Sequence, residues 1–332
     1  MLNILKTLIN AVSVSGAEED ISEAIKSMIE GCCDEVYNDT LGNLIAVKKS
    51  GKPDAKKIMM AAHMDEIGFM VTFIEDNGFI RIAPVGGINW IAAAYGEILF
   101  KNGLRGVLVP ENKVGANEYG TAKMYIDIGA KNKTEAAKKV KIGDTCTLAP
   151  KLIKLMGNRI AATKLDDKIA CVILIQALLN LKNTKAENDL YFVFTTQEEV
   201  GIRGAKTSTY AIMPDYAIAV DVTGTGDTPE ANPMICKLGE GAAIKIMDGS
   251  VICHREMVNL MMKTAEAKKI PYQSEILLYG GTDTANMQSA GSGCIAGAIS
   301  IPSRYIHSGV EMCDMKDVQS CVDLLIATLE AI

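Results

Sequence analysis

Histidine is scarce in this chain, with only three among 332 residues, and long apolar runs are lacking. The longest run, residues 170–179, is interrupted by Gln176. It is too short to cross a bilayer, which requires roughly 20 residues. Residues 1–6 also lack the basic segment and apolar stretch that begin a secretory signal. These absences predict a cytoplasmic protein with no membrane partner.

Paired cysteine motifs are missing as well. The nine cysteines are an odd number without a Cys-x-x-Cys pair, which argues against a disulfide framework or a structural zinc ribbon. An excess of positive charge is also lacking, because the net charge is −6. An acidic chain is a poor partner for nucleic acid, so none is expected. No nucleophile elbow, phosphate-binding loop or dinucleotide-binding glycine pattern is present.

The chain does contain enough apolar sequence for one large domain or two unequal ones, since 48% of its residues are hydrophobic. Strands are predicted at residues 43–48 and 57–63, the second buried on both faces. Helices are predicted at residues 17–29, 169–181, 256–269 and 315–332. Asp166 or Asp167 is expected to cap the second of these helices. We therefore predict an α/β fold with a mixed sheet between helical layers.

A stretch of short strands interrupts this pattern. These strands are expected at residues 69–74, 79–82, 98–100, 104–109, 124–128 and 145–148. The first four form two hairpins, because Asn77-Gly78 and Asn102-Gly103 lie between them. We predict a small all-β domain of residues 69–157, inserted into a discontinuous catalytic domain of residues 1–68 and 158–332.

Ionisable side chains follow four apolar segments of the chain. His63 ends the run 58–62, and His307 ends the segment that begins at residue 299. Glu198 and Glu199 follow residues 191–197, and Asp221 follows residues 216–220. In an open α/β sheet, ligands bind beyond the carboxyl ends of the strands. We therefore expect these side chains to meet at one rim of the sheet.

Such a set of side chains predicts a two-metal site. Zinc and cobalt bind imidazole nitrogen and carboxylate oxygen at ~2.0–2.2 Å. Two ions roughly 3.5–4 Å apart usually need a carboxylate that bridges them. Such a site needs one histidine and one terminal carboxylate for each ion and one carboxylate that bridges the two ions. The chain offers these five ligands: His63, Asp221, Glu199, His307 and an Asp from the Asp166-Asp167 pair.

Two further carboxylates have roles beside such a site. Glu198 is left over next to a ligand, where it would take a proton from an activated water and deliver it to a leaving amine. Asp65 would accept the second imidazole N–H of His63 and fix the ring. Taken singly, each residue has a structural interpretation as a packed histidine, a helix cap or a solvated corner. The spacing alone does not decide between these interpretations.

Six motifs distinguish the chain further. They are AHMDEIG (62–68), LDDK (165–168), TTQEEVGIRGA (195–205), DVT (221–223), GGTDT (280–284) and IPSRYIHS (301–308). In sequence and order they resemble the tetrahedral (TET) family of dinuclear aminopeptidases, which includes glutamyl and deblocking aminopeptidases and members labelled cellulase M. The resemblance implies a zinc-peptidase-like α/β/α catalytic domain with a PDZ-like or β-barrel insertion that forms dimers. It also implies that these dimers assemble into a tetrahedral dodecamer that admits peptides.

The resemblance assigns a role to each residue of the site. It implies that His63 and Asp221 hold one ion, that Glu199 and His307 hold the other, and that Asp166 bridges the two. Glu198 resembles the catalytic base of the family, and Asp65 the residue that orients His63.

We therefore predict an aminopeptidase that removes N-terminal residues from short peptides. Two Zn²⁺ or Co²⁺ ions per subunit are expected, with a bridging hydroxide as the nucleophile. Two alternatives remain. One is a metal-independent glycoside hydrolase that uses two carboxylates, as the cellulase label suggests. The other is a catalytically silent scaffold of the same fold.

Overall fold

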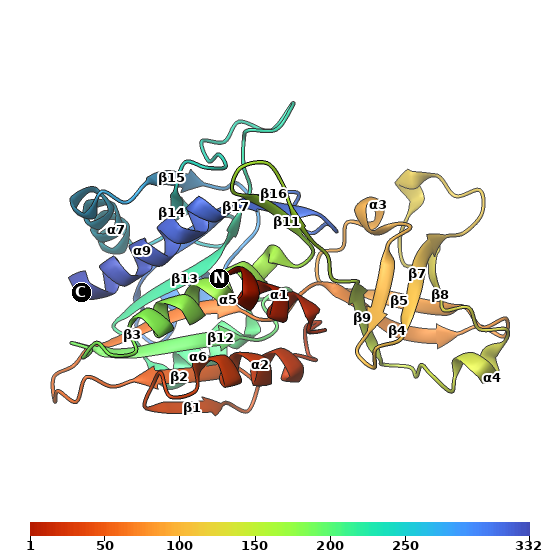
Figure 1. Ribbon diagram of the computed structural model, residues 1–332, viewed down its shortest axis with the longest axis horizontal. Helices are drawn as coiled ribbons and strands as arrows, with labels where there is room; N and C mark the ends of the chain where they lie inside the picture. Colours follow the sequence, from red (N-terminus) through yellow and green to blue (C-terminus); the bar gives the residue numbers. More distant parts are fainter.

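The computed structural model describes residues 1–332 and contains two sheets, a large mixed sheet and a closed barrel. Figure 1 shows the barrel at one end of the molecule, beside the larger part in which helices cover the sheet. This arrangement confirms the predicted fold class. No helix has the length and apolar character needed to cross a membrane.

The large sheet has 11 strands, most of them in the order β1-β2-β12-β3-β13-β16-β17-β11-β10, and β14 joins β16 to β15. Its strands are β1 (Glu35–Asn38), β2 (Leu44–Lys48), β3 (Lys57–His63), β10 (Leu152–Lys154), β11 (Arg159–Ala162), β12 (Asp189–Thr195), β13 (Tyr216–Thr223), β14 (Ala242–Met247), β15 (Tyr272–Ile276), β16 (Ile295–Arg304) and β17 (Glu311–Asp314). Strands β12, β3, β13 and β16 run parallel to one another at its centre.

Strand β3 shows why the centre of the sheet forms as predicted. Alternate residues of this apolar run face opposite sides, so that Met60 and Ala62 join the larger core while Met59 and Ala61 join the smaller one. Both faces of a parallel sheet are covered by helices, which requires such a continuous apolar run. In the parallel register Thr195 lies beside His63, so the carboxyl ends of β3 and β12 share one edge.

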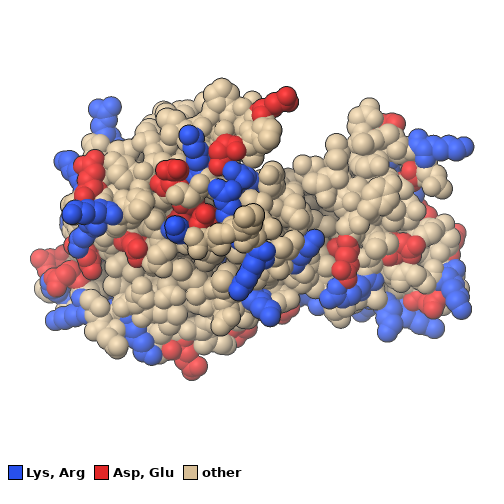
Figure 2. Space-filling model, turned by 45° about the horizontal axis from the view of Figure 1, so that its top comes forward, with Lys and Arg blue, Asp and Glu red and all other residues tan.

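Helices form a layer on each face of the sheet. The larger layer contains α1 (Leu2–Asn10), α2 (Glu19–Ile29), α5 (Leu165–Asn180), α7 (Arg255–Lys268) and α9 (Met315–Ala331). The smaller layer contains α6 (Arg203–Ile212) and α8 (Thr284–Gln288). Helix α5 is buried along most of its length and packs on β3 and β13. Figure 2 shows basic side chains interspersed with acidic ones over one face of the molecule.

The barrel is a separate sheet with its own core of 14 buried residues. Its strands are β4 (Gly68–Ile74), β5 (Ile80–Val85), β6 (Glu97–Phe100), β7 (Arg105–Pro110), β8 (Met124–Asp127) and β9 (Thr145–Leu148), and the short helices α3 (Trp90–Ala93), α4 (Lys133–Ala136) and the 3₁₀ turn Ala116–Glu118 lie between them. The expected hairpins β4–β5 and β6–β7 are both antiparallel pairs. Strand β10 lies inside the range 69–157 predicted for the insertion, yet it pairs with β11 of the large sheet.

Candidate metal centre and active site

Asp166 lies between the two histidines that the sequence singled out. Its Oδ1 is 3.0 Å from Nε2 of His63, and its Oδ2 is 3.3 Å from Nε2 of His307. These residues come from the end of β3, the start of α5 and the loop after β16, so only the folded sheet brings them together. One carboxylate therefore faces both imidazoles, with one oxygen directed to each.

Asp221 and Glu199 extend this arrangement on either side of Asp166. Oδ1 of Asp221 is 4.0 Å from Nε2 of His63, and Oε2 of Glu199 is 3.3 Å from Nε2 of His307. Ligands bound at about 2.1 Å to one tetrahedral ion are about 3.4 Å apart. The observed separations therefore suit one histidine and one carboxylate on each of two ions.

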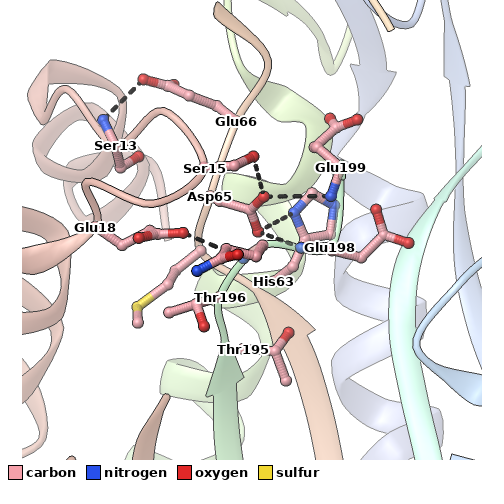
Figure 3. Close-up of polar contacts among 12 residues, drawn as sticks. Ser13, Ser15, Glu18, His63, Asp65, Glu66, Thr195, Thr196, Glu198 and Glu199 are labelled. Carbon is pink, nitrogen blue, oxygen red and sulfur yellow. Dashed lines mark hydrogen bonds and ion pairs between the residues drawn. The ribbon is translucent and has the colours of Figure 1, made fainter. Parts of the chain in front are cut away.

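Asp65 is fully buried. Its carboxylate lies beside the ring of His63 (Figure 3). Its Oδ1 lies 3.3 Å from Nδ1 of His63 and accepts the backbone N–H of Glu198 at 3.0 Å. Its Oδ2 accepts the backbone N–H of Glu199 at 3.2 Å and the hydroxyl of Ser15 at 2.6 Å. One carboxylate thus lies against the His63 ring and accepts hydrogen bonds from the turn that carries the two glutamates.

The side chains of Glu198 and Glu199 point in different directions (Figure 3). Glu199 reaches His307, whereas the carboxylate of Glu198 forms no hydrogen bond within the chain and lines the cavity beside the site. The two adjacent glutamates thus direct one carboxylate to the imidazole of His307 and the other to the cavity.

His307 reaches Asp166 because the chain reverses after β16. Tyr305 and His307 have φ values of 61° and 62°, a region that residues other than glycine seldom adopt. Gly87, in the loop after β5, lies against the ring, since a Cβ on Gly87 would be 3.0 Å from Nδ1 of His307. The segment that follows the barrel strand β5 therefore forms one wall of the site.

The predicted Asp cap of α5 is wrong. Asp166 and Asp167 both have non-helical backbone angles, and the side chain of Asp166 turns to the histidines. Asp167 is fully buried, and neither of its oxygens has a hydrogen-bond partner. One of these oxygens lies within 4.8 Å of ligand atoms of His63 and Asp221. Asp167 therefore adds a further acid to this side of the site.

Burial and neighbouring charges control the titration of the site. Burial raises the pKa of four acids, and other acids nearby raise it further, in Glu198, Glu199, Asp167 and Asp221. Burial opposes ionisation of Asp166 as well, but its contacts with His307 and His63 lower the pKa of that carboxyl below its usual value. The carboxylate between the histidines is thus the most readily ionised of the group.

The donor set fits divalent cations. Oε1 of Glu199 and both oxygens of Asp167 are buried without a hydrogen-bond partner. Buried polar atoms normally have partners, and zinc or cobalt ions bind this combination of imidazole and carboxylate. Cations here would bind the Glu199 carboxylate and offset the repulsion among the acids, that with Asp167 included, which raises their pKa.

A cavity of about 630 Å³ opens onto His63, Asp166, Glu198 and Glu199. Its volume lies within the usual range of small-ligand sites, about 300–1,000 Å³. Its other walls combine apolar with polar side chains, among them Ile202, Leu277, Tyr279, Thr223 and Thr282. The cluster of acids and histidines therefore lies in a cavity large enough to bind a small ligand.

Three features of the site were not predicted from the sequence. Ser15 donates to Asp65 from 50 residues away, Gly87 contacts His307 from the loop after β5, and Glu311 accepts backbone N–H groups of both Asp166 and His307. None of these contacts follows from a local pattern, because each depends on how distant segments pack.

Comparison with known proteins gives consistent matches. A family model described as M42 glutamyl aminopeptidase matches residues 42–324. A protein of Acetivibrio thermocellus, whose name places it among the aminopeptidases, is 49% identical over 99% of this chain and 98% of its own. A solved aminopeptidase from Desulfurococcus kamchatkensis has a TM-score of 0.93 at 36% identity, covering 99% of this chain and 94% of that one.

A structure of the Pyrococcus horikoshii TET1 peptidase has a TM-score of 0.87 at 32% identity and covers 98% of both chains. That peptidase can assemble into a tetrahedron or a large octahedral shell. The resemblance drawn from the motifs is thereby confirmed. The chain belongs to the M42 glutamyl aminopeptidase family and is an aminopeptidase.

Proposed function

We propose that this protein is a dinuclear metal-dependent aminopeptidase that hydrolyses short peptides. In this proposal His63 and Asp221 hold one ion, Glu199 and His307 hold the other, and Asp166 bridges them. The observation that carries it is the position of Asp166, whose two oxygens lie 3.0 and 3.3 Å from the two imidazoles. A shared carboxylate is what two ions at a short separation require.

Each side chain then has a separate task. Bound ions of the zinc or cobalt type would polarise the scissile carbonyl and lower the pKa of a coordinated water towards ~7. Glu198 would accept a proton from the attacking water and return it to the departing amine nitrogen. Burial and nearby acids raise the pKa of Glu198, which suits a group that must both gain and lose a proton near neutral pH. Asp65 would keep the ring of His63 in place.

We also propose that the protein forms a homo-oligomer, with the barrel of residues 68–148 as its dimerisation domain. Support comes from the TET1 peptidase of similar structure, which assembles into a tetrahedron or an octahedral shell. A tetrahedral dodecamer built from dimers is the expected form. Light scattering of the purified protein measures this mass directly, and a monomer would refute the proposal.

The substitution Glu198→Gln tests the mechanism. General acid–base groups contribute typically 10²–10⁴-fold to rate, so kcat on aminoacyl-p-nitroanilides should fall by about this factor. The metal content should remain at two ions per subunit, because Glu198 is not a ligand in the proposal. The neighbouring substitution Glu199→Gln is the control, since it should lower the metal content instead. Turnover by Glu198→Gln at the wild-type rate would remove Glu198 from the mechanism.

Chelation separates this function from its alternatives. Treatment with EDTA should abolish aminopeptidase activity, and Zn²⁺ or Co²⁺ should restore it. A glycoside hydrolase that relies on two carboxylates would be insensitive to EDTA. A silent scaffold would hold no ion after mild purification and show no turnover with any divalent metal.

A further inference from the structure

Glu311 is a buried acid with no place in the proposed reaction. It is the first residue of β17 and is 3% exposed. Strand β17 pairs with β11, where Glu311 lies opposite Ala162, and β11 leads directly to the start of α5. The register therefore places this carboxylate between the segment that carries Asp166 and the loop that carries His307.

Both oxygens of Glu311 accept hydrogen bonds from the backbone of the proposed ligands. Oε2 accepts the N–H of Asp166 at 2.9 Å, and Oε1 accepts the N–H of His307 at 2.8 Å. Neither N–H has a partner in regular secondary structure, because Asp166 is non-helical and His307 follows the end of β16. The same carboxylate thus satisfies two backbone donors and ties two segments of the site together.

These bonds restrain two backbones that are otherwise unusual. His307 has a φ of 62°, a conformation that a non-glycine residue holds only when its surroundings fix it. Asp166 interrupts the start of a helix with a ψ of 107°. A residue that binds both N–H groups sets the separation between the Asp166 carboxylate and the His307 imidazole, which is 3.3 Å.

We propose that Glu311 is a positioning residue that holds the bridging carboxylate and the second imidazole at the separation a shared ion requires. Both oxygens of Glu311 are occupied by these backbone N–H groups and its side chain does not line the cavity, so in this proposal it is not a metal ligand. Groups that support metal ligands typically contribute 10–100-fold to metal affinity. This inference rests on the proposed dinuclear site.

The substitution Glu311→Gln tests it, because the amide keeps the size of the side chain but offers only one acceptor oxygen. Titration of the metal-free protein with Co²⁺, followed by calorimetry and by the visible spectrum of bound cobalt, gives the dissociation constant of each ion. At least one constant should rise by about 10–100-fold, and the cobalt spectrum of that ion should change. Excess Co²⁺ should restore turnover.

Asp317 provides the matched control. It is a buried carboxylate whose oxygens accept the N–H groups of Gly239 and Gly241 at 2.7 and 2.8 Å, and it does not line the cavity. Asp317→Asn should lower thermal stability without changing either cobalt constant. A generally loosened fold would weaken binding in both variants, and this result would overturn the inference.

The outcomes separate the inference from the proposed function. Failure of the wild-type protein to bind two ions would refute the dinuclear site itself. Normal binding by both the wild type and Glu311→Gln would refute only the role of Glu311. Should Glu311→Gln not fold, Glu311→Asp keeps the charge but is one methylene shorter, so it cannot reach both N–H groups. The same criterion on the cobalt constants then applies to that variant.

Discussion

Addition of a single methyl group at Gly87 should disturb the proposed metal centre. The backbone of Gly87 does not have a positive φ, so alanine fits its conformation. A Cβ there would be 3.0 Å from Nδ1 and 3.1 Å from Cε1 of His307, whereas ordinary contacts begin at 3.4 Å. The ring or the loop must therefore move by about 0.4 Å.

A shift of this size is large for a metal ligand. Ligand distances are expected to stay within about ±0.2 Å of their ideal values. We expect Gly87→Ala to lower the affinity for the ion bound by His307 by roughly 10-fold, which is the lower end of the effect for groups that support metal ligands. The assay is a Co²⁺ titration of the metal-free protein, with peptidase activity recorded at each addition.

Gly120→Ala is the control for this experiment. It also lies outside the positive-φ region, and its added Cβ would meet no atom within 4 Å. This variant should bind metal and turn over substrate like the wild type. If Gly87→Ala also bound both ions with unchanged constants, the contact between the loop after β5 and His307 would have no part in holding the site.

Two further predictions concern stability. Phe192 is fully buried in the larger core, so Phe192→Ala should lower the free energy of unfolding by about 3–5 kcal/mol. Phe73 is half-exposed on the barrel, so Phe73→Ala should lower it by less than about 1 kcal/mol. Urea unfolding checks both values, and equal losses would contradict the assignment of the core. Burial raises the pKa of Asp227, but its hydrogen bonds from Arg304 lower it to about 2, so the ionised form is favoured in the folded state. The stabilisation, about 1 kcal/mol once solvent screening of this ion pair is included, is present above the unfolded pKa near 4 and is lost as the pH falls towards 2. Unfolding free energies from pH 6 to pH 3 should therefore fall more steeply for the wild type than for Asp227→Asn, and parallel curves would contradict this.

Much of the α/β part could be predicted because its signals are local. The apolar run Lys57–His63 is observed as β3 with the same bounds, since a strand buried on both faces leaves a continuous apolar pattern. The hairpins of the barrel were also expected, because Asn-Gly pairs mark their turns. The α5 cap failed because the capping rule considers only the helix itself. At Asp166 the side chain is bound by histidines and the backbone N–H by Glu311.

The candidate site was predicted in part for a similar reason. Parallel strands that end at one edge bring their terminal side chains together, and the structure does bring together His63, Asp166, Glu199, Asp221 and His307. No comparable rule predicts the contacts that support these ligands from outside the site. Glu311 depends on the pairing of β17 with β11, and Gly87 depends on how the loop after β5 lies against His307. Both are products of tertiary packing between segments distant in sequence.

The path of the chain through the barrel has a consequence for the site. His63 precedes the barrel and Asp166 follows it, yet the first and last barrel strands are neighbours, with Phe69 paired to Cys146. The chain therefore enters and leaves the barrel at neighbouring points. Once the barrel is folded it connects the two ligands as a short loop would, so the loop-closure entropy of joining them depends on the short connecting segments and not on the full length of the insertion. Barrels of different size could occupy this position while His63 and Asp166 stayed in register.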